Sequence, residues 1–400
     1  MGCRLPAARG SMAAMGERSE TDTLVVGAGP AGLAAGACLR RAGVPFEIVE
    51  RGDAVGVAWR GHYDRLHLHT AKNHSALPFT PFPRDLPCYV PRAKVVEYLE
   101  SYAREHALAP TTGFDVASVR REDGAGSGFA VEARDGRRVR ARRVVVCTGY
   151  NRAPVRPSWP GQEAFAGEVL HSSKYKNGKA FQGKRVLVVG IGNTGGEIAI
   201  DLHEHGARPA LSVRSPVVVI PRDFLGAPTQ VTGILMNPLP LSVREVIGKA
   251  VSRLAFGDLS PLGFGRPTEG PARMIERGRI PLIDVGTIAL VRAGKITVVP
   301  GIERFETGGA VFTDGRRLDL DAVVLATGYT TGLADFLEGA AAVTDAKGYP
   351  RSHFAGDVSP THERIYFLGF VNPPTGFLRQ IAIDAPRIVA RIAKARGAAR

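Results

Sequence analysis

Cysteine is scarce in this sequence, and its cysteines are not paired. The 400 residues include four cysteines, none of them spaced as Cys-x-x-Cys. This excludes a disulfide framework and argues against a zinc site or a redox-active dithiol of the thioredoxin-reductase type. His67 and His69 lack a third partner at ligand spacing, so we predict that the chain binds no metal. Reduced cysteines favour a cytoplasmic protein.

Long apolar runs are also absent. No apolar stretch approaches the roughly 20 residues that a membrane-spanning helix needs, so we expect no membrane span. The first 21 residues are mostly small and polar, and they lack the apolar centre of a secretory signal. We predict a disordered tail at residues 1–21, with a short organelle-targeting peptide as the alternative.

Acidic residues are outnumbered by basic ones. The chain has 52 Lys and Arg against 38 Asp and Glu, which gives a net charge of +14. The densest basic run, residues 134–143, alternates with Val and Ala as the solvated face of a strand does, and no aromatic residues are interleaved with it. We therefore predict no nucleic-acid partner and assign the charge to solubility and to attraction of anionic cofactors.

Glycine, by contrast, is frequent, and three glycines near the N-terminus have the spacing of a nucleotide-binding turn. Gly27, Gly29 and Gly32 fit the pattern G-x-G-x-x-G between an apolar strand and a helix expected at 33–41. The first glycine permits a tight turn, the second lets the backbone approach a pyrophosphate, and the third lets helix and strand pack closely. A second strand ends in Glu50, whose carboxylate can accept both ribose hydroxyls. The order of these features predicts a dinucleotide site for FAD or NAD.

The same pattern occurs a second time, at residues 186–195. In the first copy the acid lies 23 positions after the first glycine, whereas that position of the second copy holds Val213, followed by Arg214 and Ser215. An acid would repel a 2′-phosphate, and an arginine with a hydroxyl would bind one. The second site is therefore predicted to bind NADPH.

Each glycine unit is followed by a similar segment. Residues 144–150 read Val-Val-Val-Cys-Thr-Gly-Tyr and residues 323–329 read Val-Val-Leu-Ala-Thr-Gly-Tyr, and each Thr lies 13 positions after the Asp of an Asp-Gly turn. This duplication predicts an α/β fold with two doubly wound Rossmann-type dinucleotide-binding domains, the NADPH domain inserted into the FAD domain. The predicted bounds are 22–157 and 320–400 for the FAD domain, and 158–319 for the NADPH domain with a lid region around 217–281.

Other elements are predicted from local patterns. The segment 63–72 is expected to be extended, with His67 and His69 on one face, and a β-meander is expected at 114–146. Helices are predicted at 93–105, 243–254 and 376–395, with Pro386 interrupting the last one. The N-terminus of that last helix is expected to face a flavin, because its positive dipole end would stabilise the anionic reduced form.

Four stretches together resemble the class B flavin monooxygenases of the flavin-containing monooxygenase superfamily. Besides the two glycine turns, they are residues 165–175, which fit F-x-G-x-x-x-H-x-x-x-Y/F, and residues 326–329. Tyr175 stands where Baeyer–Villiger enzymes have Trp, which disfavours that subclass. Within the superfamily the chain is most similar to the plant YUCCA-like group of indole-3-pyruvate monooxygenases. The stretches that carry this similarity are 63–69, 81–83, 98–103, 282–287 and 298–302.

The resemblance implies an NADPH-dependent flavin monooxygenase, a monomer or homodimer. In this family NADPH reduces FAD, the reduced flavin activates O₂ as a C4a-(hydro)peroxide, and that species oxygenates a small organic substrate. The favoured substrate is indole-3-pyruvate or a related 2-oxo acid, oxidatively decarboxylated as in auxin biosynthesis. Two alternatives stay open: an N- or S-oxygenating flavin monooxygenase of secondary metabolism, and an NADPH-dependent flavin reductase or oxidase.

Site residues follow from the motifs and the resemblance. Asn193, His69 and Lys72 are predicted as polar groups near the flavin and nicotinamide, with a helix cap, pocket lining and a surface charge as their respective alternative roles. The residues predicted to hold FAD are Gly27, Ala28, Gly29, Pro30, Ala31, Gly32, Glu50, Arg51, Trp59, His69, Thr148 and Gly149. The residues predicted to hold NADPH are His171, Gly190, Ile191, Gly192, Asn193, Thr194, Gly195, Arg214, Ser215, Thr327 and Gly328.

Overall fold

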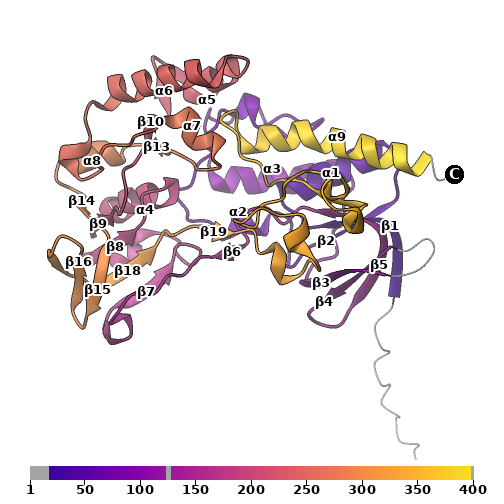
Figure 1. Cartoon of the computed structure of the whole chain (residues 1–400), viewed down its shortest axis with the longest axis horizontal. Coiled ribbons are helices and arrows are strands. Elements are labelled where there is room, and N and C mark those ends of the chain that lie inside the picture. The colour runs from indigo at the N-terminus through magenta and orange to yellow at the C-terminus, as the bar shows by residue number, and fades with distance from the viewer. Residues whose placement is uncertain (1–17, 123–127, 398–400) are drawn as a thin grey trace, which may run out of the picture.

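The computed structural model describes residues 18–122 and 128–397. Their strands form two large sheets that lie side by side, each with helices packed on it (Figure 1). The apolar residues just before each glycine turn, 24–26 and 186–189, are buried, as expected for parallel strands covered on both faces. The chain therefore has the predicted α/β fold with two Rossmann-type units.

The first sheet is built around β1, the strand before the first glycine turn. Its order is β2 (Phe46–Val49), β1 (Arg18–Val26), β5 (Arg138–Val146), β4 (Phe129–Ala133) and β3 (Val116–Arg121). Both β2 and β5 run parallel to β1, whereas β5, β4 and β3 form the predicted antiparallel meander. The end of β5 also pairs with β20 (Ile365–Phe367), so the chain returns to this sheet after the second unit.

Helices α1 (Pro30–Arg41) and α9 (Phe377–Gly397) pack on each other in the first unit, and α3 (Arg92–Glu105) lies beside α1 (Figure 1). The prediction that Pro386 interrupts the last helix is wrong, because α9 continues through it. Ile381 and Ile388 are buried in the same core on either side of Pro386, so packing holds both halves of the helix in line.

The second sheet is parallel throughout. Its order is β14 (Thr297–Val299), β9 (Arg208–Ser212), β8 (Arg185–Val189), β18 (Ala322–Leu325) and β7 (Glu168–His171). Helix α4 (Asn193–Glu204) follows β8, and α8 (Thr287–Arg292) lies against α4. A separate antiparallel sheet joins β15 (Ile302–Glu306), β16 (Gly309–Phe312) and β17 (Arg317–Asp319). The two units meet where β6 (Ala153–Pro154) pairs with β19 (Tyr329–Thr330).

The predicted lid region is mainly helical and lies above α4 in Figure 1. Strand β10 (Val219–Pro221) opens it and pairs in parallel with β13 (Leu282–Asp284), which closes it. Between them lie a hairpin of β11 (Asp223–Phe224) and β12 (Ala227–Pro228), and the helices α5 (Thr229–Met236), α6 (Leu241–Phe256) and α7 (Pro271–Glu276). The helices predicted at 93–105 and 243–254 are confirmed as α3 and α6.

Short elements complete the chain. They are helix α2 (Val57–Gly61) and the 3₁₀ helices η1 (Lys72–His74), η2 (Gln162–Ala164), η3 (Gly178–Phe181), η4 (Ser260–Leu262), η5 (Leu333–Asp335), η6 (Ala340–Ala342), η7 (Ala355–Asp357) and η8 (Pro360–His362). In the part of the chain that the structure describes, no helix combines the length and the apolar character needed to cross a membrane.

Three predicted boundaries differ from the structure. The predicted tail 1–21 lies outside the described residues up to position 17, but residues 18–21 belong to β1 and pair with β5. The predicted boundary at 319/320 precedes β18, which pairs with β7 and β8 and so belongs to the second unit. No continuous strand forms at 63–72, where His67 makes only an isolated bridge to Pro91.

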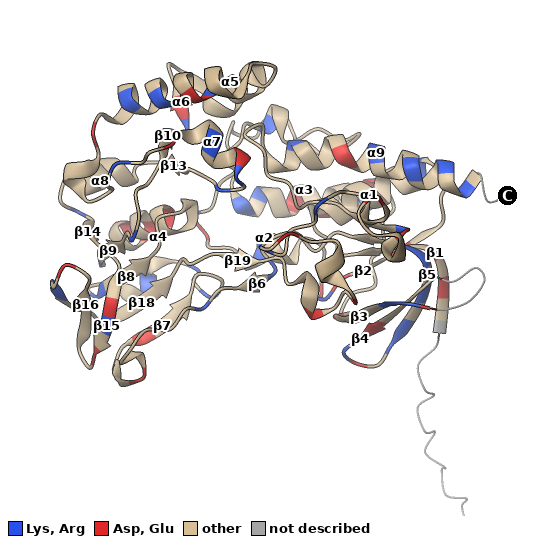
Figure 2. Ribbon diagram, viewed as in Figure 1, with Lys and Arg blue, Asp and Glu red and all other residues tan. Residues whose placement is uncertain are grey.

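The basic run at residues 134–143 forms much of β5. Burial alternates along the first half of this strand, as the Arg/Val/Ala pattern predicts. Arg138 pairs with Glu132 at 3.1 Å, and Arg143 pairs with Asp22 at 2.9 Å. Figure 2 shows basic and acidic residues interspersed over both halves of the molecule. Neighbouring carboxylates thus balance part of the positive charge.

Candidate cofactor sites and the junction between them

The first glycine turn has the close backbone approach that its sequence predicts. Gly27 has φ +108°, and a Cβ there would lie 2.8 Å from the carbonyl oxygen of Cys147. A Cβ on Gly32 would lie 1.7 Å from the carbonyl oxygen of Gly27, so only glycine lets α1 begin this close to β1. A Cβ on Gly29 would meet nothing within 4 Å. The turn is therefore closed on its protein side and open where a ligand would lie.

Glu50 holds the turn from the end of β2. One carboxylate oxygen accepts a hydrogen bond from the N–H of Ala28 at 2.7 Å, and the other accepts one from the N–H of Gly52 at 3.0 Å. The residue is buried, with 7% of its surface exposed. Each carboxylate oxygen retains a second lone pair. Glu50 can therefore order the turn and still accept a hydrogen bond from a ligand hydroxyl.

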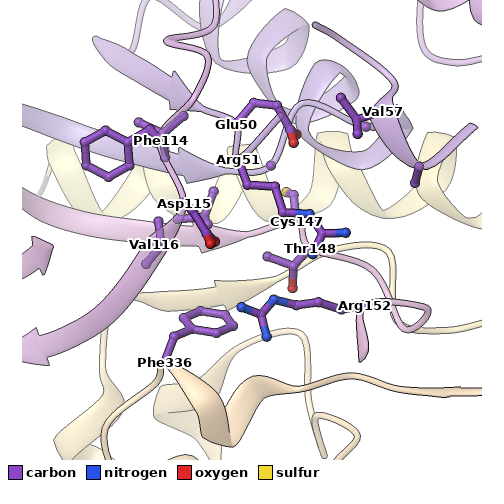
Figure 3. Close-up of a pocket in the computed structure, with 15 residues that line it drawn as sticks. Glu50, Arg51, Val57, Phe114, Asp115, Val116, Cys147, Thr148, Arg152 and Phe336 are labelled. Atoms are coloured by element: carbon purple, nitrogen blue, oxygen red, sulfur yellow. The ribbon is translucent and has the colours of Figure 1, made fainter. Parts of the chain in front are cut away.

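A pocket opens beside this turn, and Figure 3 shows Arg51, Thr148 and Arg152 around it. The hydroxyl of Thr148 is buried and has no hydrogen-bond partner within the protein. A buried hydroxyl without a partner is costly, so this one is suited to a bound ligand. Gly149, next to it, has φ +69°, a conformation that favours glycine.

The remaining residues predicted for FAD, apart from His69, lie in two places. Ala28 just before α1 is buried, and so are Pro30, the first residue of that helix, and Ala31. Trp59 packs against the core of the first unit from α2. Sequence reasoning missed Arg152, which donates to the Gly332 carbonyl at 3.0 Å and pairs with Asp335.

The second glycine turn repeats the geometry of the first. Gly190 has φ +105°, and a Cβ there would lie 2.6 Å from the carbonyl oxygen of Ala326. A Cβ on Gly195 would lie 2.0 Å from the carbonyl oxygen of Gly190, whereas one on Gly192 would meet nothing within 4 Å. Ile191 packs on the core of this unit. The N-terminus of α4 is thus presented in the same way as that of α1.

The strand that follows, β9, ends differently from β2. Val213 is buried, and Arg214 and Ser215 after it are exposed. No carboxylate takes the place that Glu50 has in the first unit. The exposed arginine and serine at this strand end fit a 2′-phosphate, as the sequence predicts.

The motif at 165–175 ties β7 to the rest of the second unit. His171 is buried, and its Nε2–H donates to the Gly328 carbonyl at 3.2 Å while Nδ1 accepts from the Ser173 N–H at 3.1 Å. Burial is the main cause that lowers the pKa of His171, so the ring is held neutral. Tyr175 donates to Asp201 of α4 at 2.6 Å. Both side chains of the motif thus have structural partners.

Thr327 has a similar structural role. Its hydroxyl donates to the Val155 carbonyl at 2.6 Å, and Gly328 follows with φ +82°. Together with His171 these residues set the path of the chain where it passes from the second unit to the first. The turn lies after β18, beside the second glycine turn.

Residues 60–69, which we call the junction segment, lie within the first unit in sequence but make many of their contacts with the second. Tyr63 is buried in the core of the second unit. The N–H of Asp64 donates to the Lys176 carbonyl at 2.8 Å, and the ammonium of Lys176 donates to the carbonyls of Arg60 and Gly61 at 3.0 and 2.7 Å. This anchoring explains why no strand forms here.

The junction segment ends in a buried polar cluster. His69 Nε2 lies 2.5 Å from a carboxylate oxygen of Glu197, and the Tyr63 hydroxyl donates to the same oxygen at 3.2 Å. Thr194 of the second glycine turn also hydrogen bonds to the Tyr63 hydroxyl. Burial, followed by the neighbouring Glu197, raises the pKa of Tyr63 well above its usual value. His69 thus connects the first unit with the first turns of α4.

The other two residues predicted to be catalytic have structural partners. Lys72 donates to the backbone carbonyls of Pro83, Arg84 and Leu86, which accounts for the three donors of its ammonium group. It therefore orders the proline-rich loop, and the predicted catalytic role does not fit this geometry. Asn193 Oδ1 accepts from the Ile283 N–H at 2.7 Å, so its side chain ties α4 to β13.

Sequence reasoning missed two buried polar residues at the junction, Glu197 and Gln230. Gln230 Oε1 accepts from the Ala71 N–H at 2.8 Å, and its amide donates to the Thr375 carbonyl at 2.7 Å, just before α9. The surroundings of Glu197 were a usable signal, because an acid between Gly196 and Ile198, just after a buried strand and glycine turn, needs a partner if it is buried. Nothing local marks Gln230, since its partners are distant in sequence.

The two glycine turns fit the two cofactors that the sequence predicts. Each has a middle glycine with free space beside it for a ligand, a helix N-terminus, and a third glycine in close contact with a backbone carbonyl. The first adds a buried acid and the unpartnered Thr148 hydroxyl, and the second adds an exposed arginine. These features match FAD in the first unit and NADPH in the second.

Comparison with known proteins agrees with this geometry. The model of the flavin-binding monooxygenase-like family matches residues 21–349. Indole-3-pyruvate monooxygenase YUCCA1 of Oryza sativa subsp. japonica is 38% identical over 344 residues, which cover 84% of each chain. Probable indole-3-pyruvate monooxygenase YUCCA9 of Arabidopsis thaliana is 39% identical over 337 residues, covering 83% of this chain and 80% of that one.

Solved structures show the same architecture. A flavin-containing monooxygenase from Stenotrophomonas maltophilia superposes with a TM-score of 0.70 at 25% identity, covering 94% of this chain and 99% of that one. Cyclohexanone monooxygenase from Rhodococcus sp. Phi1 bound to NADP⁺ superposes with a TM-score of 0.69 at 21% identity, covering 95% and 85%. The chain therefore belongs to the flavin-binding monooxygenase-like family and is an NADPH-dependent flavin monooxygenase with FAD and NADPH as its cofactors.

Proposed function

We propose that this enzyme oxidatively decarboxylates indole-3-pyruvate or a related aryl 2-oxo acid. The observation that carries the proposal is the 38% identity to an indole-3-pyruvate monooxygenase over 84% of both chains. The reaction consumes one 2-oxo acid, one O₂, one NADPH and one proton. It yields the acid shorter by one carbon, CO₂, NADP⁺ and water. Bound FAD would supply the redox chemistry between NADPH and O₂.

The residues of the chain would bind and orient the two cofactors. We assign FAD to the turn from Gly27 to Gly32 with Glu50 and Thr148, and NADPH to the turn from Gly190 to Gly195 with Arg214 and Ser215. The N–H groups at the starts of α1 and α4 would face the two pyrophosphates. The lid region, which Gln230 attaches to loops of the first unit, would help exclude water from the reacting groups.

The test is a product assay with a complete balance. Purified enzyme with bound FAD receives NADPH and O₂ in the presence of indole-3-pyruvate, and NADPH loss, CO₂ and indole-3-acetate are quantified together. We expect the three in equal amounts. Equal NADPH loss and H₂O₂ formation without organic product would instead identify a flavin reductase or oxidase. Oxygenation of an amine or sulfide but not of the 2-oxo acid would identify the N- or S-oxygenating alternative.

A further inference from the structure

Glu197 is a buried carboxylate that lies in α4, four residues after the helix begins at Asn193. Only 4% of its surface is exposed. Burying a carboxylate costs several kcal/mol unless hydrogen bonds compensate it. Its two side-chain partners, Tyr63 and His69, both come from the junction segment. The acid therefore joins the NADPH unit to a segment that the sequence assigns to the FAD unit.

The junction segment is fixed firmly at its other contacts with the second unit. Tyr63 is 3% exposed within the core of that unit, and Asp64 accepts a hydrogen bond from the Asn177 amide at 2.8 Å. Arg65 forms an exposed ion pair with Glu204, the last residue of α4. The segment thus contacts α4 near its start, through Glu197, and at its end, through Glu204.

Beyond His69 the chain continues directly into the first unit. Thr70 lies against Gly376, where a Cβ would come within 3.1 Å of the Thr70 methyl group. Ala71 donates to Gln230, whose amide donates to the Thr375 carbonyl just before α9. A continuous series of contacts therefore leads from the second turn of α4, through Glu197 and His69, to the N-terminus of α9.

We propose that Glu197 is a positioning residue that couples nucleotide binding at the second glycine turn to the flavin side of the junction. The inference rests on the proposed placement of NADPH and FAD in the two turns. By holding His69 and Tyr63, Glu197 fixes the loop at residues 69–71 relative to α4. With both cofactors bound, this alignment would orient the loop at residues 69–71 between the two nucleotide sites, and the cofactors themselves would supply the hydride transfer from NADPH to FAD.

Glu197→Gln is the direct test, because it keeps the shape of the side chain and removes its charge. Tyr63 and His69 both bond to one carboxylate oxygen, and an amide oxygen in its place can still accept from both, but without the negative charge. We expect NADP⁺ to bind about tenfold more weakly in calorimetric titration, since these buried hydrogen bonds lose the strength that the charge gives them. The change in flavin absorbance on adding NADP⁺ should shrink, and amide hydrogen exchange at residues 62–71 should rise.

Glu204→Gln is the matched control, because it removes an exposed ion pair between the same helix and the same segment. We expect it to change NADP⁺ affinity less than about twofold, as exposed pairs contribute little. His69→Gln tests the contact from the other side and covers the case in which Glu197→Gln fails to fold. In the double variant His69→Gln/Glu197→Gln, the loss should be no larger than that of the more affected single variant.

Two outcomes would overturn the inference. In one, Glu197→Gln keeps normal NADP⁺ affinity, flavin absorbance change and hydrogen exchange. In the other, Glu204→Gln changes these three measurements as much as Glu197→Gln does. The effect would then come from any contact that attaches the segment to α4 and not from Glu197 in particular. Failure of the proposed function is distinguishable, because the unaltered protein would then give no CO₂ from the 2-oxo acid while the binding and exchange measurements would still report on Glu197.

Discussion

The two glycine turns of this chain share a backbone and differ at one strand end. Gly27 and Gly190 have φ of +108° and +105°, and both cross a carbonyl that precedes Thr-Gly-Tyr. The strand after the first turn ends in the buried Glu50, which hydrogen bonds back to the turn, whereas β9 is followed by the exposed Arg214. From this difference we expect the turn to bind a pyrophosphate in both units and the strand end to select the nucleotide.

The largest effect should come from filling the closed side of either turn. Gly32→Ala and Gly195→Ala would place a methyl group 1.7 Å and 2.0 Å from a backbone oxygen. We expect each to lower the free energy of unfolding by roughly 3 kcal/mol or more, measured by urea denaturation. Similar losses of unfolding free energy in the two variants would confirm that the two turns are packed alike. An unchanged unfolding free energy in one variant would show that its turn is packed differently.

The open side of each turn should affect cofactor binding without affecting folding. Gly29→Val and Gly192→Val meet no atom within 4 Å of the new Cβ. Gly29→Val should yield folded protein without FAD, and Gly192→Val should keep FAD but bind NADPH about 100-fold more weakly. Flavin absorbance per mole of protein measures the FAD content, and titration with NADPH measures its dissociation constant. Full flavin content in Gly29→Val would remove FAD from the first turn.

The difference between the strand ends predicts a cofactor preference. Arg214→Ala should weaken NADPH binding roughly tenfold or more and leave NADH within about twofold, because only NADPH carries the 2′-phosphate. Arg208→Ala, an exposed arginine at the opposite end of β9, is the control. Dissociation constants for both nucleotides decide the matter. Equal losses for NADPH and NADH would remove Arg214 from the phosphate site.

The smallest effect concerns the junction between the units and depends on pH. Burial, assisted by the nearby Lys176 and Arg92, lowers the pKa of His62 from 6.5 to about 4. Between these two pKa values His62 is protonated in the unfolded chain and neutral in the folded chain. The free energy of unfolding should therefore fall as the pH drops below about 6.5, until about pH 4. His62→Gln should reduce the loss in unfolding free energy between pH 7 and pH 5. An unchanged loss would exclude His62 as its source.

The turns and their helices could be predicted because their signals are local. Glycine spacing, apolar runs and the acid at position 50 lie within one strand–helix–strand unit, so periodicity and turn chemistry specify them. Residues 18–21 were missed as strand because β1 extends only through its pairing with β5, more than a hundred residues away. The end of the second unit was misplaced because β18 lies between β7 and β8 in space and not in sequence.

The junction could not be predicted because its determinants are distant in sequence. The alternation of His67 and His69 favours a strand. However, Tyr63 is buried in the core of the second unit, and this contact holds the backbone in a different path. The ammonium group of Lys72 is engaged by three carbonyls of the proline-rich loop, a tertiary fact that no local pattern indicates. Tertiary contacts here override local propensity.

The attachment of residues 60–69 to the second unit has a practical consequence for exchanging domains among relatives. A recombinant that takes its first unit from one family member and its second from another would separate Tyr63 from the core it enters and Glu197 from both partners. Inheriting this segment together with the second unit would keep those contacts intact. The second structural unit is thus discontinuous in sequence, because residues 60–69 belong to it by their contacts. A crossover point chosen from sequence order alone would separate this segment from α4 and the core that it contacts.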